Sequence, residues 1–204
     1  MSPMPDELRS RRSIRKYQQK PVPKQLIKEV LEVAGWAPSA HNAQPWRFIV
    51  LTETSSKQKL STIMAEAWAE DATKDGQKID ETTMSAKVER FATAPALILA
   101  CFTMEDMHEQ PDQKRQNVER DLALESLGAA IQNLLLTAHT KGLGACWFCA
   151  PAFCKERVRN ILKIPAEVEP AALIVMGYAD EKPLAPLRKP LDEFCFKDMW
   201  GVKF

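Results

Sequence analysis

The chain has 204 residues, with 28 Lys and Arg against 27 Asp and Glu, so its formal net charge is +1. That length suits one domain with a sizeable buried core, and we expect a single domain over residues 1–204. A near-neutral charge argues against nucleic acid as the main partner, because phosphate binding needs a net or clustered basic surface. Seven glycines and the absence of G-x-G-x-x-G and G-x-x-x-x-G-K-[ST] motifs argue against a Rossmann dinucleotide site or a P-loop.

The chain shows neither a membrane span nor a secretory signal. Its longest apolar runs, 94–102 and 171–176, have the length of a buried strand. Basic residues near the N-terminus are not followed by an apolar run. Five cysteines in such a chain indicate reduced thiols rather than a disulfide framework. We therefore expect a cytoplasmic protein with no membrane attachment.

In the first half of the chain, a short helix is predicted near residues 5–9, and an extended basic stretch follows at 11–17. Apolar positions after Pro23 fall on one face of a helix that stops near Gly35. The other elements predicted here are a loop at 38–45, a strand at 47–52, a helix at 57–70, a mobile polar segment at 71–82, a helix at 85–91 and a central strand at 96–102.

In the second half, the longest predicted helix spans 119–141, after a polar surface segment at 104–116. Its later turns are apolar almost all round, which is typical of a core or subunit-interface helix. The other predicted elements are a strand at 145–148, a helix at 151–162, a strand at 171–178, a proline-rich tail from 182 and a short helix at 191–200. Helices dominate and strands are few and widely separated, so we predict an α+β fold.

The basic stretch is the first candidate binding segment. Guanidinium groups hold a phosphate dianion well, and a hydroxyl adds a short hydrogen bond. A solvated basic arm is the alternative, since charge runs often have no partner. The residues concerned are Arg9, Arg11, Arg12, Ser13, Arg15 and Lys16.

The second candidate is the loop at 37–46, in which small residues, amides and prolines dominate. Such loops let backbone and amide groups approach a planar polar ligand, although this loop could also simply connect a helix to a strand. His41 is a weak candidate for a catalytic base, because the neighbouring sequence offers no carboxylate or nucleophile. The polar and small residues of interest are Pro38, Ser39, Ala40, Asn42 and Gln44.

The third candidate is the cysteine-containing segment at 142–154. Cys146-x-x-Cys149 could be a redox dithiol or part of a metal site, but a second C-x-x-C pair is missing. In an extended strand, alternation sends Cys146 and Phe148 to one face and Trp147 and Cys149 to the other. The two thiols would then point apart, so we expect small buried cysteines and no metal site.

Taken together, these segments resemble the flavin-dependent nitroreductase family over about residues 11–193. The resemblance is carried by the R-R-S-x-R opening, the P-S-x-x-N-x-Q-P-W loop, the G-L-G-x-C-W segment before a helix, and the basic pair Arg188 and Lys189 in the tail. Within the family, the chain is most similar to the FMN-binding C-terminal domain of the bifunctional enzyme of deazaflavin cofactor biosynthesis. Here that domain would stand alone, since 204 residues leave no room for a ligase domain.

The resemblance implies a nitroreductase-like fold, with a central, mostly antiparallel sheet surrounded by helices. It also implies an intertwined homodimer with FMN bound at the subunit interface. NADH or NADPH would donate hydride, and a nitroaromatic, quinone or unsaturated cofactor-type acceptor would receive it by a ping-pong scheme. A catalytic acid or base is not required. A flavin storage or sensing protein and a flavin-cleaving oxygenase of the same fold are the alternatives.

Matched residue by residue, the resemblance assigns three groups of cofactor-binding positions. The ring edge would run along the end of the strand at Trp147, Phe148 and Cys149. The neighbouring subunit would contribute the loop residues Pro38, Ser39, Ala40, Asn42 and Gln44. The phosphate, ribityl chain and ring would contact Arg11, Arg12, Ser13 and Arg15, with Arg188 and Lys189 reaching the phosphate from the tail.

Overall fold

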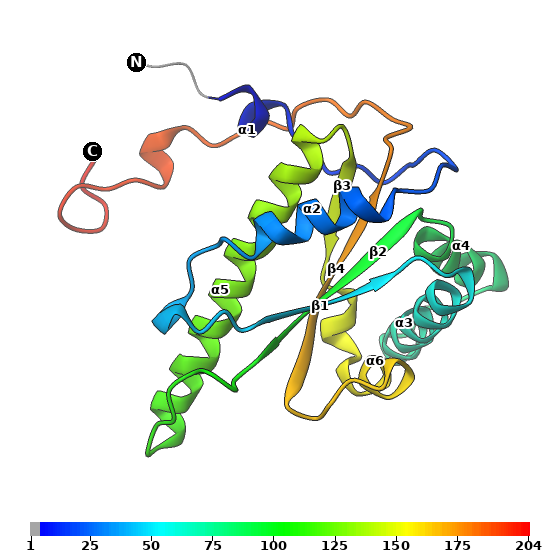
Figure 1. Cartoon of the computed structure of the whole chain (residues 1–204), viewed down its shortest axis with the longest axis horizontal. Helices are drawn as coiled ribbons and strands as arrows, with labels where there is room; N and C mark the ends of the chain where they lie inside the picture. The colour runs from blue at the N-terminus through cyan, green and yellow to red at the C-terminus, as the bar shows by residue number, and fades with distance from the viewer. Residues whose placement is uncertain (1–4) are drawn as a thin grey trace.

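The computed structural model describes residues 5–204, and within them the chain builds a four-stranded antiparallel sheet of order β1-β2-β4-β3 (Figure 1). The strands are β1 (Trp46–Leu51), β2 (Ala96–Thr103), β3 (Gly144–Phe148) and β4 (Val168–Gly177). β2 and β4 therefore lie in the centre, and β1 and β3 form the two edges. The α+β class and the antiparallel sheet agree with the sequence-based expectation.

The helices cover both faces of this sheet. In Figure 1, α2 and α5 lie on one face, while α3, α4 and α6 lie on the other. Their bounds are α1 (Asp6–Ser10), α2 (Lys24–Ala34), α3 (Thr54–Lys74), α4 (Glu81–Ala92), α5 (Gln113–Thr140) and α6 (Lys155–Leu162). Three short 3-10 turns are η1 (Ala40–Asn42), η2 (Ala150–Phe153) and η3 (Leu191–Glu193).

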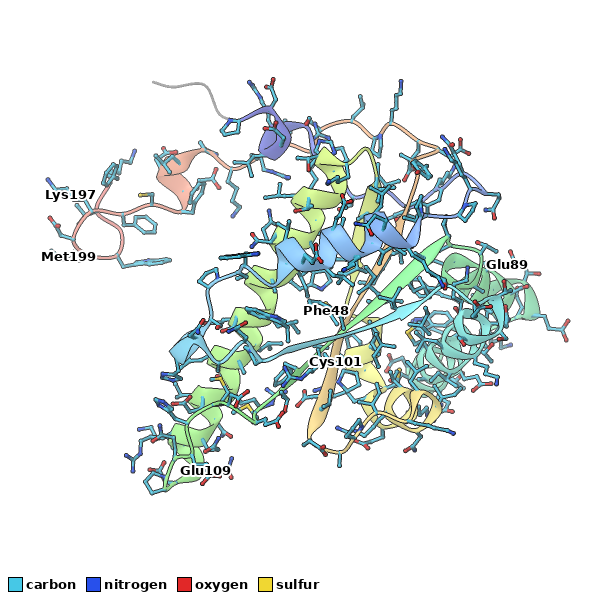
Figure 2. The ribbon with its side chains drawn as sticks, in the orientation of Figure 1. Phe48, Glu89, Cys101, Glu109, Lys197 and Met199 are labelled. Carbon is cyan, nitrogen blue, oxygen red and sulfur yellow. The ribbon has the colours of Figure 1, made fainter. Side chains whose placement is uncertain are left out.

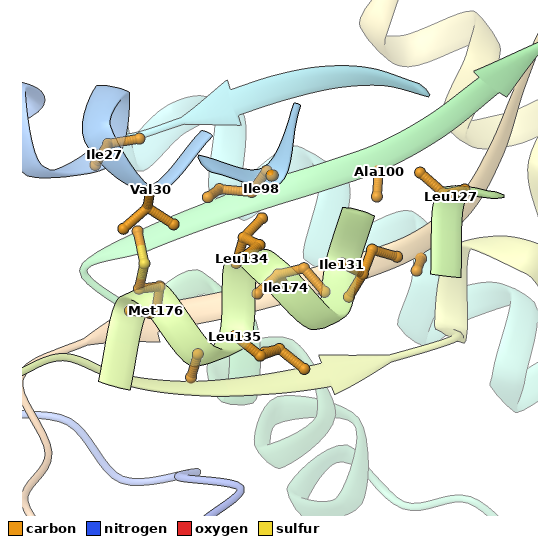
Figure 3. Close-up of a cluster of buried hydrophobic side chains, with 14 of the residues drawn as sticks. Ile27, Val30, Ile98, Ala100, Leu127, Ile131, Leu134, Leu135, Ile174 and Met176 are labelled. Atoms are coloured by element: carbon orange, nitrogen blue, oxygen red, sulfur yellow. The ribbon is translucent and has the colours of Figure 1, made fainter. Parts of the chain in front are cut away.

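Every residue of β2 is buried, which confirms the central strand predicted from its apolar run. Alternate side chains serve two separate cores. Ile98 belongs to the core under α5, where it joins Ile131 and Leu134 (Figure 3). Leu99 belongs to the opposite core, which includes Leu60 of α3. Burying each such side chain contributes about 1.5–3 kcal/mol, so both helical layers are held by one strand.

Two polar segments contain more helix than the sequence predicted. α3 continues to Lys74 because Ala72 is buried and Lys74 pairs with Asp71 at 2.9 Å. α5 begins at Gln113 because Asp112 caps its N-terminus. The Asp112 side chain accepts a hydrogen bond from the backbone N of Arg115 at 2.9 Å. The expected surface segments at 71–82 and 104–116 are accordingly shorter than predicted, and their helical parts were wrongly assigned.

Two predicted helices were wrong in extent. The helix expected at 151–162 is divided, because Cys154 adopts the non-helical angles φ −142° and ψ 40° between η2 and α6. The helix expected at 191–200 is reduced to the turn η3, and the chain beyond it closes a small loop through a bridge between Phe196 and Lys203. Both differences depend on backbone angles that apolar periodicity does not report.

Across residues 5–204, the helices are too short or too polar to span a membrane. This finding agrees with the apolar run lengths in the sequence.

Gly144 of β3 lies in close contact with Ile14 of the basic stretch. A Cβ added there would lie 2.7 Å from Cγ1 of Ile14. We expect Gly144→Ala to lower the free energy of unfolding by about 1–3 kcal/mol, because overpacking would displace Ile14. Urea denaturation measures this change.

The matched control is Gly128→Ala in α5, where an added Cβ meets its nearest atom, Cη2 of Trp147, at 3.9 Å. That variant should be as stable as the parent protein or more stable, by up to about 1 kcal/mol, because alanine favours helix over glycine. An unfolding midpoint for Gly144→Ala equal to that of the parent would contradict the close approach.

Candidate functional site

The basic stretch is held against the edge strand β3. The backbone N of Ile14 donates to the carbonyl O of Ala145 at 3.1 Å, and Ser13 forms a parallel bridge with the same residue. The hydroxyl of Tyr17 donates to the carbonyl oxygens of Ile14 and Val175. Burial raises the pKa of Tyr17 far above its usual range, so the phenol stays a neutral donor. The stretch thus has a defined position beside the sheet.

Glu181 ties the same stretch to the chain that follows β4. Its Oε1 accepts hydrogen bonds from the backbone N of Arg15 at 2.5 Å and of Lys16 at 3.1 Å. The side chain of Arg15 remains exposed. Sequence reasoning missed Glu181, and also Tyr17, because a single acidic or aromatic residue in a loop has no pattern that predicts its partner.

Arg12 and Arg11 differ in what their side chains do. Nη1 of Arg12 donates to the carbonyl oxygens of Arg9 and Arg11, each at 2.8 Å, and so closes the end of α1. Nε of Arg12 is buried and has no hydrogen-bond partner among residues 5–204. Arg11 is half-buried and lines the cavity described next.

A cavity of about 400 Å³ lies between the basic stretch, the end of α5 and the start of the tail. Arg11, Arg12 and Lys182 contribute three cations to its lining, and Glu181 adds one carboxylate. Its apolar wall consists of Leu135, Leu143 and Ala145. The combination of several cations with one apolar wall suits an anionic group attached to an apolar body.

A second cavity of about 400 Å³ continues along the same pair of elements. Gly128 and Ile131 of α5 line it, together with Trp147 and Cys149 at the end of β3. Positions 128 to 139 of α5 therefore border the two cavities in turn, over about 16 Å at 1.5 Å per residue. We call this line of contact between α5 and β3 the α5–β3 seam.

The basic stretch covers the outer edge of β3 at Ala145 and leaves the next outward-facing position for a ligand. The carbonyl of Ala145 faces outward, since Ile14 binds it there. Backbone groups of alternate residues in an antiparallel strand face the same side, so the N–H of Trp147 also points away from β4. A donor at this position can bind a planar ligand laid along the seam.

The predicted alternation in this strand is confirmed. Cys146 and Phe148 are on the α3 and α6 face, where Phe148 packs edge-on against Phe91 at 5.1 Å. Trp147 and Cys149 line the cavity on the α5 face. All five cysteines are free, and burial raises the pKa of the Cys146 thiol. Cys146 is thus a small buried side chain, as expected, whereas Cys149 is exposed.

Within one chain, the structure does not bring the loop at 38–45 to the arginine-lined cavity. The loop docks against the middle of α5, where the backbone N of Ala40 donates to Oγ of Ser126 at 3.1 Å, whereas the cavity borders the C-terminal end of that helix. Figure 1 shows α1 at the C-terminal end of that helix, away from the loop that follows α2. Ser39 stabilises the loop by accepting from the backbone N of Gln44 at 3.0 Å. Pro38, Asn42 and Gln44 are exposed.

His41 has the carboxylate neighbour that its local sequence lacks, which corrects the expectation of an isolated histidine. Its Nε2 lies 3.2 Å from Oε2 of Glu119, a residue 78 positions away on α5. Gln110 donates to the other oxygen at 3.0 Å. Burial raises the pKa of Glu119, but the hydrogen bonds from Gln110 and His41 outweigh it, so that the pKa lies below its usual value.

The tail residues Arg188 and Lys189 are exposed and do not line the arginine cavity, although Lys182 and Pro183 do. Lys189 lies 3.7 Å from Glu193. Beyond them the tail leaves the body of the molecule as an arm, on which Figure 2 labels Lys197 and Met199.

Comparison with known proteins identifies the family of this chain. The sequence model described as "Nitroreductase family" matches residues 8–178. The chain is 32% identical over 186 residues to "Putative NAD(P)H nitroreductase YfhC" of Bacillus subtilis strain 168, covering 91% of this chain and 89% of that protein.

Solved structures show the same fold. A nitroreductase family protein of Clostridium difficile 630 superposes with a TM-score of 0.69 at 25% identity, covering 95% of this chain and 97% of that one. The BluB-like flavoprotein of the same organism gives a TM-score of 0.77 at 22% identity, covering 95% and 98%. With a family match over most of its length and relatives that align nearly end to end, the chain belongs to the Nitroreductase family.

Proposed function

We propose that this protein is an FMN-dependent oxidoreductase that takes hydride from NADH or NADPH and reduces a small electron-poor acceptor. Membership of the Nitroreductase family makes it an oxidoreductase of the nitroreductase type. The observation that carries the finer proposal is the cationic cavity that opens onto the α5–β3 seam. Residues 1–204 would act as one domain. The free thiols of the protein are typical of the reducing cytoplasm, where we place it.

The residues around the seam fit FMN, which joins a phosphate dianion to a planar ring. Arg11 and Lys182 lie at the cationic end and would hold the phosphate. Arg12 has an unpartnered, buried Nε in the same wall. Leu135 and Ile131 offer apolar surface further along, and the outward N–H of Trp147 can donate to the ring.

Bound there, FMN would supply the two-electron redox chemistry that links a nicotinamide donor to the acceptor in two half-reactions. The chain's own part is to bind, orient and polarise. Ser13 and Arg15 would contact the ribityl chain and the ring, and a guanidinium beside the ring stabilises the negative charge that reduction places there. Phe148 and Cys149, which follow Trp147 at the end of β3, would lie along the ring edge as well. Protons can come from water, so an acid or base residue is not needed.

A homodimer would complete each site. Apolar side chains on the C-terminal arm are strongly exposed, including Leu187 at 99% and Trp200 at 88%. Trp36, just before the loop at 38–45, is 86% exposed. Exposed apolar surface of this kind marks a protein interface. We infer that a second copy covers the arm and that each subunit lays its loop against the flavin of the other.

In that dimer, the loop residues would be the ones assigned by the sequence resemblance, and the tail would bring its basic pair toward a phosphate. These residues are Pro38, Ser39, Ala40, Asn42, Gln44, Arg188 and Lys189.

The acceptor would be a nitroaromatic, a quinone or an unsaturated cofactor precursor, with a deazaflavin-type precursor as the specific case. A cavity of about 450 Å³ borders Cys149 and is lined by Trp68, Asp75, Gln77 and Phe153. Three of these residues belong to α3 or the segment directly after it. We therefore assign acceptor choice to the region at 71–82, together with the segment at 105–116.

The first test is the absorption spectrum of the purified protein and its response to reductant without oxygen. We expect a two-banded flavin spectrum that NADH or NADPH bleaches and that an added quinone or nitroaromatic restores. Mass spectrometry of the released flavin identifies it as FMN.

Other outcomes would contradict the proposal. A flavin spectrum that neither nucleotide bleaches favours storage or sensing. Loss of the flavin itself during turnover with oxygen favours a flavin-cleaving oxygenase. Protein that neither retains nor rebinds FMN refutes flavin dependence.

The second test concerns the arginines. We expect Arg11→Ala and Arg188→Ala each to weaken FMN binding about 10- to 100-fold, since a charge-assisted hydrogen bond contributes about 1.5–3 kcal/mol. Quenching of flavin fluorescence during titration of flavin-free protein measures the affinity. Arg157→Ala is the matched control, because Arg157 pairs with Glu70 at 2.6 Å on the opposite face of the sheet. Equal affinity in all four proteins would refute the phosphate assignment.

The third test concerns the arm. Replacing both Leu187 and Trp200 with Ser should shift the protein from dimer to monomer and release its flavin, because the apolar contacts with the second copy are lost. Analytical ultracentrifugation gives the mass, and absorbance at the flavin bands gives the flavin content. Lys197→Ser, a polar change on the same arm, should leave both unchanged. A fully active, flavin-loaded species of monomer mass would contradict the shared site.

A further inference from the structure

Three side chains from distant parts of the chain meet beside the loop at 38–45. His41 lies in η1, His108 in the segment before α5, and Glu119 in α5. Their ligand atoms all lie within 4.8 Å of one another. The rings of His41 and His108 stack with centroids 3.6 Å apart, and Nε2 of His41 lies 3.2 Å from Oε2 of Glu119. No motif predicted this cluster, because its members are separated by 67 and 11 positions along the chain.

The carboxylate in this cluster is buried and oriented. Glu119 is only 6% exposed. Gln110 occupies Oε1, so Oε2 is the atom turned toward His41. A buried carboxylate needs hydrogen bonds or a compensating positive charge, and the groups that face this one are an amide and two imidazoles. Hydrogen bonds from Gln110 and His41 already stabilise this carboxylate, and a bound cation would take the place of the contact from His41 at Oε2.

The donor set and its spacing suit a zinc-class ion. Imidazole nitrogen and carboxylate oxygen bind Zn²⁺ at about 2.0–2.2 Å, so neighbouring ligands of a tetrahedral ion lie about 3.3 Å apart. The 3.2 Å between His41 and Glu119 matches that separation. An imidazole lone pair lies in the ring plane, so the stacked ring of His108 must tilt to aim at the same ion. Its exposed side chain has room to do so.

The backbone beside the cluster is strained. His41, Asn42 and Gln44 have φ values of 56°, 55° and 48°, in the left-handed region that residues other than glycine seldom adopt. Such conformations persist where surrounding contacts over-determine them. An ion bonded to His41, His108 and Glu119 would tie this loop to α5 and to the segment before it.

We propose that His41, His108 and Glu119 form a binding site for a divalent transition metal of the zinc class, which pins the loop at 38–45 to α5. Three protein ligands leave a fourth position for water. The role is structural, and the site does not depend on the identity of the flavin or of its acceptor.

The experiment uses the full chain with its flavin, freed of any histidine tag and treated with chelator. Calorimetric titration with Zn²⁺ should give one ion per chain, and Co²⁺ should develop the visible absorption of a tetrahedral site. We expect His108→Ala and Glu119→Gln to weaken binding at least about 10-fold, since loss of a mere hydrogen-bond partner around a metal already costs that much. Hydrogen exchange at residues 39–44 should slow with Zn²⁺ in the parent protein but not in His108→Ala or Glu119→Gln.

The controls are one histidine and one carboxylate outside the cluster. His139→Ala removes the remaining histidine, which contacts Oγ of Ser10 at 2.8 Å, and Glu109→Gln changes an exposed neighbour of His108 near the start of α5 (Figure 2). Both should bind Zn²⁺ as the parent does. Circular dichroism establishes whether each variant is folded. If Glu119→Gln does not fold, the comparison of His108→Ala with the parent protein tests the site by itself. Absence of saturable binding, or equal affinity in His108→Ala and the parent, would overturn the site.

Discussion

The position of the basic stretch on the edge strand β3 is the constraint on which the candidate site depends. One backbone hydrogen bond, from Ile14 to Ala145, sets the register between the two segments. Tyr17 and Glu181 hold the same stretch from its other end. Because the backbone is fixed in this way, guanidinium groups can surround an anion with a smaller loss of conformational entropy on binding. The close contact of Gly144 with Ile14 belongs to the same arrangement, because a larger residue would push the stretch away.

Helix α5 joins the parts of the site that lie far apart. Its 28 residues span about 42 Å, so its two ends can serve different tasks. Near its C-terminal end it borders the arginine-lined cavity, and further along it shares the α5–β3 seam. Ser126 in the middle of the helix and Glu119 in its N-terminal half hold the loop at 38–45. In the proposed dimer, the loop of one subunit would face the cavity of the other, and each would rest on α5 of its own subunit.

Local patterns predicted the elements whose environment is uniform along their length. The apolar run of β2 and the alternation from Ala145 to Phe148 were both confirmed, because each side chain's face follows from its place in an extended strand. Patterns failed at Cys154, where a change of backbone angles divides a helix, and at Gln113, where the cap Asp112 starts α5 within a polar segment. The same holds for the candidate site. Its arginines and its loop could be recognised as motifs in the sequence, whereas Glu181 and Glu119 could not.

What the sequence determined by itself was the four strands, most of the helices, the α+β class and the family, since these rest on periodicity and on motifs that are contiguous along the chain. Only the tertiary structure decided which motifs meet. It joined the basic stretch to β3, kept the loop at 38–45 away from that cavity within one chain, and brought His41 to a carboxylate 78 positions distant. The physical reason is that such contacts depend on how α5 packs against the sheet, and no local segment contains that information.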